Sequence, residues 1–188
     1  GEGARIWWPN KDHITAEGDS VRMVYTVPSS MMAVGNGNLR NIDKNGAKTT
    51  YEWFVKNPIN NYNISVQIGN YVAVQDTFIK DNTIHTFNHY VLDYNKEVAS
   101  NYFKQAKEVL RFYEKYFGDY QWYEDGYKLV EVPYLGMEHQ SAVTYGNGFS
   151  MYNGVRSKSW PMYGVIDPLI IHETGHEWFG NSVTASDP

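Results

Sequence analysis

The chain has 188 residues, no cysteine and a formal net charge of −5 at pH 7. Without cysteine it can form neither disulfides nor thiolate–metal bonds, so histidines and carboxylates are the side chains left to bind a metal. The acidic balance, with no run of Lys or Arg, excludes recognition of nucleic acid by phosphate neutralisation. No stretch approaches the roughly 20 apolar residues of a transmembrane segment, although 42% of the residues are hydrophobic, enough to bury a core.

The compartment is left open by the composition. The many Asn and Tyr residues lean towards an exported protein, periplasmic or extracellular. A chain that begins at Gly1 could also have lost a signal peptide.

Residues 1–92 are predicted to form β-structure. Short segments rich in β-branched and aromatic residues alternate with turn sequences at residues 28–30, 35–38 and 44–46. The predicted strands are residues 21–27, 49–55, 62–67, 71–74 and 84–92. His85 and His89 lie four residues apart in the last of these, where a surface or cross-strand role is favoured over a metal site, because no third ligand is near.

The pattern changes near residue 93. From residue 95 to 117 apolar side chains recur at helical spacing, and Gly118 fits the end of a helix. The expected buried face consists of Val98, Tyr102, Ala106, Val109, Leu110, Tyr113 and Phe117. Two strands are predicted at 128–132 and 141–145, followed by a loop at 147–161. We therefore divide the chain into a β-domain at 1–92 and a truncated α/β domain at 93–188.

The segment after this loop carries the strongest chemical signal. His172-Glu173-Thr174-Gly175-His176 fits the H-E-x-x-H pattern of zinc hydrolases. On a helix, residues i and i+4 lie on one face, so His172 and His176 can share one Zn²⁺. Glu173 can then act as the general base and take a proton from a water that the metal activates.

The flanking residues favour a helix for this motif. Asp167 is a good N-cap, and Pro168 suits the first helical position. Residues 169–171 are apolar, which indicates a buried helix. Gly175 weakens a helix by about 1 kcal/mol relative to Ala, and we interpret it as a close-packing position.

A zinc hydrolase needs a third protein ligand and one open position. In metzincins a Gly and a His follow the second His by three and six residues. Here those positions hold Phe179 and Ser182, which excludes that class. A later carboxylate is the other common solution, but the only acid after Glu177 is Asp187. Glu177 points about 100° away from His176 around the helix, which favours a surface or supporting role over a ligand.

Residues 172–181, read as H-E-x-x-H-x-W-F-G-N, resemble the signature of the gluzincin zinc aminopeptidases, the family of aminopeptidase N and leukotriene hydrolase. The resemblance implies one Zn²⁺ per chain. It also implies a third ligand from a Glu at about position 195, in the pattern H-E-x-x-H-x₁₈-E. This chain ends at Pro188. The resemblance therefore implies a fragment that stops before its third zinc ligand.

A second motif agrees with this resemblance. Residues 135–139 are similar to the family's exopeptidase motif G-x-M-E-N, with Leu135 and His139 in place of Gly and Asn. The family likeness implies that Glu138 binds the free α-amine of a peptide and that the backbone at Gly136 and Met137 contacts the peptide. A carboxylate that faces an ammonium in a cleft forms a charge-assisted hydrogen bond. Such a site demands a free N-terminus.

Weaker similarities extend over the first part of the chain. Residues 3–9 with Asp12, residues 34–37, and residues 57–59 with Tyr62 resemble segments of the family's N-terminal β-domain. The implied fold is the end of an antiparallel β-domain followed by the first part of a thermolysin-like zinc peptidase domain.

Two functions of different classes follow from these motifs. The first is a zinc metallo-aminopeptidase that hydrolyses the N-terminal bond of peptides, with the 188-residue chain alone expected to be inactive. The second is a non-catalytic, peptidase-like scaffold that binds peptides or a protein partner. An endopeptidase or epoxide hydrolase on the same framework is a third reading, and Glu138 argues against a general endopeptidase.

Overall fold

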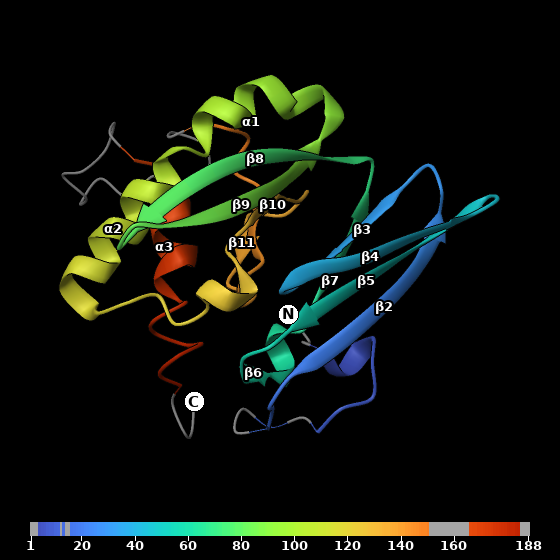
Figure 1. Ribbon diagram of the computed structural model, residues 1–188, viewed down its shortest axis with the longest axis horizontal. Helices are drawn as coiled ribbons and strands as arrows, with labels where there is room; N and C mark the ends of the chain where they lie inside the picture. Colours follow the sequence, from blue (N-terminus) through green and yellow to red (C-terminus); the bar gives the residue numbers. More distant parts are fainter. Residues whose placement is uncertain (1–3, 12, 14–15, 151–165, 185–188) are drawn as a thin grey trace.

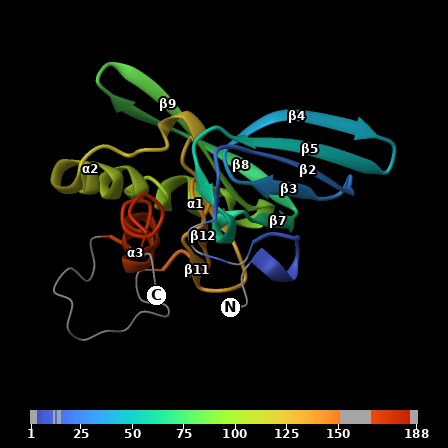
Figure 2. The same ribbon diagram turned by 90° about the horizontal axis from the view of Figure 1, so that it is seen from below.

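The computed structural model describes residues 4–11, 13, 16–150 and 166–184. The predicted loop at 147–161 is thus described only as far as residue 150, and Asp12 and Asp187 also lie outside the described residues. Figures 1 and 2 show the α-helices gathered on one side of the molecule and the strands β2 (Val21–Pro28), β4 (Asn38–Asn45) and β5 (Lys48–Val55) on the other.

The first part of the chain folds into three small antiparallel sheets. Strands β2 (Val21–Pro28), β5 (Lys48–Val55) and β4 (Asn38–Asn45) form one sheet in the order β2-β5-β4. Strand β3 (Met32–Gly35) pairs with β7 (Val66–Gly69), and β1 (Glu17–Gly18) pairs with β6 (Ile59–Asn60). In β5 the buried residues Tyr51, Trp53 and Val55 alternate with more exposed ones, as expected for a strand with one face on a core.

A five-stranded mixed sheet follows, in the order β11-β12-β10-β9-β8. Its strands are β8 (Tyr71–Lys80), β9 (Thr83–Leu92), β10 (Leu129–Glu131), β11 (Gly136–Met137) and β12 (Val143–Tyr145). Strands β9, β10 and β12 run parallel, whereas β8 and β11 are the antiparallel edges. The sheet therefore takes strands from both sides of residue 92, and the domain division placed there stays a prediction.

In the part of the chain that the structure describes, three α-helices cover one face of this sheet: α1 (Lys96–Tyr102), α2 (Gln105–Phe117) and α3 (Pro168–Gly175). Short 3₁₀ turns lie at Ala4–Ile6, Asn61–Asn63, Asp93–Asn95 and Tyr123–Asp125. The helix predicted from 95 to 117 is wrong in one respect, because the chain bends at residues 103–104 and buries the Phe103 ring. Val98 and Phe117 consequently lie exposed, whereas Ala106, Val109 and Leu110 are buried as expected.

The central strands are buried on both faces. In β9, Tyr90 packs in the core of the small β-sheets, while its neighbour Val91 packs in the core under the helices. In β10, Val130 and Leu129 divide in the same way. Burial on both faces is characteristic of parallel strands in an α/β arrangement, and it joins the two halves of the described chain through one sheet.

The longer strand predictions were mostly confirmed, with differences in bounds. The segment predicted as a strand from residue 62 begins as the 3₁₀ turn Asn61–Asn63 and becomes extended at Val66, and β8 continues to Lys80 beyond the predicted residue 74. Strands β1, β3, β4, β6 and β11 were not predicted. Strand β4 exposes almost every side chain and so shows no alternation. No helix in the described part of the chain is long and apolar enough to cross a lipid bilayer.

Candidate active site

Helix α3 is anchored at its N-terminus by a buried aspartate. The Asp167 side chain accepts a hydrogen bond from the Leu169 N–H at 2.8 Å, which confirms the predicted N-cap, and Pro168 occupies the first turn. The hydroxyls of Tyr102 and Tyr145 each donate to the same carboxylate at 2.8 Å. These contacts fix the start of the helix against α1 and β12.

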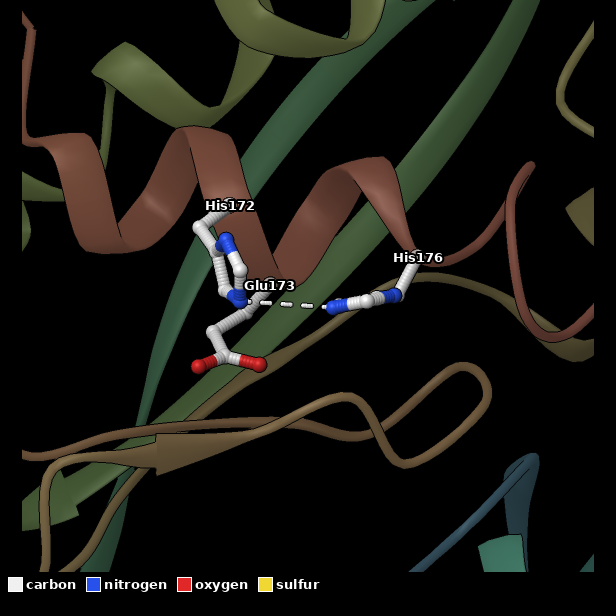
Figure 3. Close-up of side chains that lie close together, drawn as sticks. All are labelled: His172, Glu173 and His176. Carbon is white, nitrogen blue, oxygen red and sulfur yellow. Dashed lines mark hydrogen bonds between the residues drawn. The ribbon is translucent and has the colours of Figure 1, made fainter. Parts of the chain in front are cut away.

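The histidines of the motif face each other from successive turns (Figure 3). The Nε2 atoms of His172 and His176 lie 3.3 Å apart. His176 caps the C-terminus of α3 with helical dihedral angles, so the i,i+4 relation is kept. Its Nδ1 lies 2.9 Å from the Phe179 carbonyl oxygen and donates to it when it carries the proton, which leaves Nε2 free as a ligand.

This geometry fits a zinc ion. Two nitrogens that bind a tetrahedral Zn²⁺ at about 2.0–2.1 Å are about 3.3 Å apart, which is the separation of the two Nε2 atoms. Within the described residues, one group of His, Asp and Glu side chains is close enough to hold a metal, with ligand atoms within 4.8 Å of one another. It consists of His172, Glu173 and His176.

Glu173 is buried between α3 and β11, with 7% of its surface exposed. Burial, and then the nearby Glu138 carboxylate, raise the pKa of Glu173 to about 7. Burial and the neighbouring His176 lower the pKa of His172, while Glu138 opposes them. The charge of Glu138 thus reaches both Glu173 and His172.

Gly175 is a close-packing position, as interpreted from the sequence. A Cβ at Gly175 would lie 2.4 Å from the Tyr113 hydroxyl oxygen. That hydroxyl donates to the Ile171 carbonyl oxygen at 3.1 Å. Glycine therefore lets α2 approach α3 at the turn between the two histidines.

Gly136 and Met137 form the edge strand β11 beside Glu173. A Cβ at Gly136 would lie 2.9 Å from the Glu173 Oε1 atom, so a side chain here would displace the carboxylate. Strand β11 pairs with β12 through Gly136–Tyr145 and Met137–Thr144. As the last strand in the sheet, β11 has one edge that pairs with no other strand of the described chain.

Glu138 follows β11 and is half-buried. Its carbonyl oxygen accepts a hydrogen bond from the Asn181 Nδ2 atom at 2.9 Å. Its carboxylate lies beside the Tyr62 hydroxyl: burial, and then the charge of Glu138, raise the pKa of Tyr62 to about 12. The six site candidates named from the sequence therefore lie together, around the C-terminal half of α3 and strand β11. They are Gly136, Met137, Glu138, His172, Glu173 and His176.

A cavity of about 710 Å³ borders this place. It is lined on one side by Gly136, Met137 and His139 and on another by Tyr62 and Tyr134. His139 thus lines the cavity, and burial lowers the pKa of its imidazole to about 4. The imidazole is therefore neutral at pH 7.

Sequence reasoning left the role of Glu177 open and missed two other residues. Of the surface and supporting roles expected for Glu177, the structure shows the supporting one: the side chain is 1% exposed, and its carboxylate accepts from the Ser141 N–H at 2.8 Å. Asn181 and Tyr62 contact the residue proposed to bind the amine across 43 and 76 positions of sequence. No local pattern reveals contacts at such distances, although a polar amide directly after a zinc motif is a signal that could have been followed.

The other candidate pair behaves differently. His89 is 1% exposed, and its Nδ1 accepts a hydrogen bond from the Leu129 N–H at 2.9 Å. His85 packs against Tyr123 with ring centroids 4.2 Å apart and the rings tilted by 32°. The cross-strand alternative therefore describes His89 better than a surface position does, since Leu129 lies on the neighbouring strand.

Comparisons with known protein families and solved structures find similar proteins. Residues 101–187 match the model of the peptidase family M1 domain. Comparison with curated protein sequences gives no match. Among solved structures, the M1 zinc metallopeptidase from Deinococcus radiodurans is similar, with a TM-score of 0.74, 18% identity, and coverage of 98% of this chain and 39% of that one.

Variants of that metallopeptidase are similar to the same degree. A mutant bound to a Tyr-Ser-Ala substrate gives a TM-score of 0.72 at 17% identity and covers 98% of this chain and 40% of that one. The chain thus spans about 40% of the length of these structures. Its fold is the predicted one, a β-region followed by the start of a zinc peptidase domain. The second part of the chain is similar to the M1 peptidase domain over residues 101–187.

Proposed function

We propose that this chain belongs to an aminopeptidase, which removes the first residue of peptides that have a free N-terminus. The observation that carries the proposal is the position of Glu138. Its charge reaches both Glu173 and His172, as their pKa shifts show. A carboxylate whose charge reaches Glu173 and His172 can hold the α-amine of a peptide while the first peptide bond lies at the metal.

His172 and His176 would hold the zinc through their Nε2 atoms. A zinc ion bound there acts as a Lewis acid and lowers the pKa of a water molecule. Glu173 takes the proton of the attacking water and passes it to the leaving amine. Burial, and then the charge of Glu138, raise the pKa of Glu173 to about 7, close to the pH at which a general base works best.

The edge strand β11 supports the positioning of a peptide. An extended peptide can add to a free sheet edge through main-chain hydrogen bonds, and β11 offers such an edge directly beside Glu173. The similar metallopeptidase whose structure contains a Tyr-Ser-Ala substrate is consistent with a peptide ligand. We propose that Gly136 and Met137 contribute their backbone to this pairing.

The third zinc ligand is proposed to be a Glu that follows the second histidine by nineteen positions, in the pattern that the resemblance implies. With two histidine ligands alone, zinc affinity is expected to be low. We accordingly expect the 188-residue chain by itself to have no peptidase activity, and the assays below use the longest form that the gene encodes.

The proposal is tested with free and N-acetylated aminoacyl chromogenic amides in the presence of zinc. We expect cleavage of the free-amine substrates only. Glu138→Ala should abolish that preference, whereas Glu97→Ala, which removes an exposed carboxylate on α1, should not. Glu173→Gln should keep zinc and lose about 10²–10⁴-fold in turnover, the usual contribution of a general base.

Two outcomes would contradict the proposal. Equal cleavage of free and acetylated substrates would remove the amine-binding role of Glu138 and favour another hydrolase. Absence of cleavage with zinc shown to be bound would favour the peptide-binding scaffold.

A further inference from the structure

The segment that follows the second histidine contains two buried polar residues which the mechanism does not use. Glu177 is 1% exposed and Asn181 is 4% exposed. Both lie within five residues of His176, on the same short stretch of chain as the zinc-binding pair. Burying such groups is costly unless they are fully hydrogen-bonded, so their partners are informative.

All four hydrogen-bonding positions of the Asn181 amide are used. Its oxygen accepts from the Asn63 amide at 2.8 Å and from the Tyr62 hydroxyl at 3.2 Å. Its Nδ2 donates to the Glu138 carbonyl oxygen at 2.9 Å and to the Glu177 Oε2 atom at 3.3 Å. An amide has two donors and two acceptor sites, so each of them has a partner. Asn181 therefore joins the β-region at residues 62–63 to Glu138 and to residues 177–181, which we call the zinc segment.

Glu177 holds the other end of the same loop. Its Oε1 atom accepts from the Ser141 N–H at 2.8 Å. Ser141 has φ +59°, a left-handed conformation that a non-glycine residue adopts only when its surroundings hold it. Its Oγ accepts from the Gly37 N–H at 2.8 Å, and its carbonyl oxygen accepts from the Lys128 Nζ at 2.9 Å.

The loop from Glu138 to Ser141 is thus fixed at both ends by side chains of the zinc segment. Asn181 fixes the backbone of Glu138, and Glu177 fixes the backbone of Ser141. Because both residues lie within five positions of His176, the loop is tied to the same stretch of chain as the zinc-binding pair. Tyr62 and Asn63 brace this arrangement from the β-region.

We infer that Glu177 and Asn181 are positioning residues that set the distance between the zinc-binding histidines and the amine-binding carboxylate of Glu138. This inference rests on the aminopeptidase function proposed above. A dipeptide unit has a fixed length between its α-amine and its scissile carbonyl. Two sites that recognise these groups must keep that spacing, and a rigid polar junction does so better than apolar packing, since hydrogen bonds are directional.

The test compares Asn181→Ala with the wild-type enzyme on a free-amine aminoacyl amide. We expect KM to rise about tenfold, the equivalent of one hydrogen bond, with kcat changed less than about threefold. Zinc content should be unchanged. Inhibition by acetohydroxamic acid, which binds zinc but has no α-amine, should also be unchanged.

Variants of Glu177 provide a graded series. Glu177→Gln keeps an oxygen for the Ser141 N–H and should raise KM less than Glu177→Ala does. If Asn181→Ala does not fold, this series decides the question in its place. The matched control is Asn95→Ala, which removes an amide hydrogen bond of 2.6 Å to the Glu131 carboxylate and should leave KM unchanged, because neither residue bonds to Glu138 or to the zinc segment.

The possible results separate the inference from the function on which it rests. A wild-type enzyme that does not distinguish free from acetylated substrates contradicts the aminopeptidase function itself. A wild-type enzyme that does distinguish them, with KM equal in Asn181→Ala and the Glu177 variants, overturns the positioning role. Loss of zinc or of hydroxamate inhibition in these variants, with KM unchanged, also overturns the positioning role. The hydrogen bonds of Glu177 and Asn181 would then support the metal site and not the amine site.

Discussion

The chain contains two histidine pairs that have the same spacing in the sequence but different geometry in the fold. His172 and His176 lie on α3, where a four-residue step brings their Nε2 atoms within 3.3 Å. His85 and His89 lie on β9, where the same step spans about 13 Å at about 3.3 Å per residue. Spacing in the sequence therefore indicates a metal site only when the secondary structure converts it into proximity.

The chemistry of the two pairs differs accordingly. The helical pair presents two Nε2 atoms to one point, while Nδ1 of His176 is occupied by the Phe179 carbonyl. In the strand pair, Nδ1 of His89 accepts from the backbone of β10, and the ring packs edge-on against Phe103. The helical pair is arranged to bind one metal ion. In the strand pair, His89 packs in the core and connects β9 to β10.

The largest expected effect separates the pairs by metal binding. His176→Ala should lower zinc affinity by more than the 10–100-fold that loss of an outer partner costs, because a ligand itself is removed. His85→Ala is the matched control and should leave affinity unchanged. Zinc stoichiometry and competition with a chelator, measured on the longest form that the gene encodes, give the result.

Equal zinc affinity in His176→Ala and the wild type would contradict the assignment of the helical pair. Loss of zinc in His85→Ala would place a metal on the strand, and the contrast between the pairs would fail.

A smaller effect concerns acid stability and belongs to the strand pair. Burial lowers the pKa of His89 to about 4, against an ordinary value of 6.5. Between these values the unfolded chain binds the additional proton, so the free energy of unfolding decreases as the pH falls from 6.5 to 4. The shift corresponds to roughly 3 kcal/mol.

His89→Gln removes this proton-binding group but keeps an oxygen that can accept from the Leu129 N–H. Urea unfolding at pH 7 and pH 4 should therefore show a smaller loss in the variant than in the wild type. His85→Gln, on the same strand, should lose as much stability as the wild type. Equal losses in His89→Gln and the wild type would mean that His89 does not carry the acid sensitivity.

Much of the fold was predictable where one face of an element is buried. Strands β2, β5 and β9 were found because their side chains alternate or are β-branched, and α3 was found through its cap and its apolar first turn. Strand β4 was missed because its stability comes from pairing with β5, with its side chains in solvent. The bend at residues 103–104 was not predicted, because no Pro or Gly lies there to indicate the end of a helix.

The site shows the same limit. The zinc-binding pair and Glu173 were predictable, since their geometry follows from one helix. The links from Asn181 to Glu138, and from Glu177 to Ser141, depend on the folded arrangement of segments some 40 residues apart. Local sequence specifies which groups are available, but tertiary packing decides which of them meet.

The smallest of the expected effects tests how closely the helical pair is packed. In an isolated helix, Gly175→Ala would stabilise by about 1 kcal/mol. Here the new Cβ would lie 2.4 Å from the Tyr113 hydroxyl oxygen and 2.8 Å from its Cζ atom. Overpacking of this kind costs about 1–3 kcal/mol, so the net result should be a destabilisation of about 1 kcal/mol, measured by urea unfolding.

Tyr113→Phe provides the control for this prediction, because it removes the nearest atom and leaves the ring. In that background Gly175→Ala should cost less than in the wild type, and the difference is the coupling between the two positions. If Gly175→Ala stabilises the wild-type chain, α2 can shift away from the new Cβ with little loss of free energy. The close approach of α2 to the turn between His172 and His176 would then not explain the glycine at position 175.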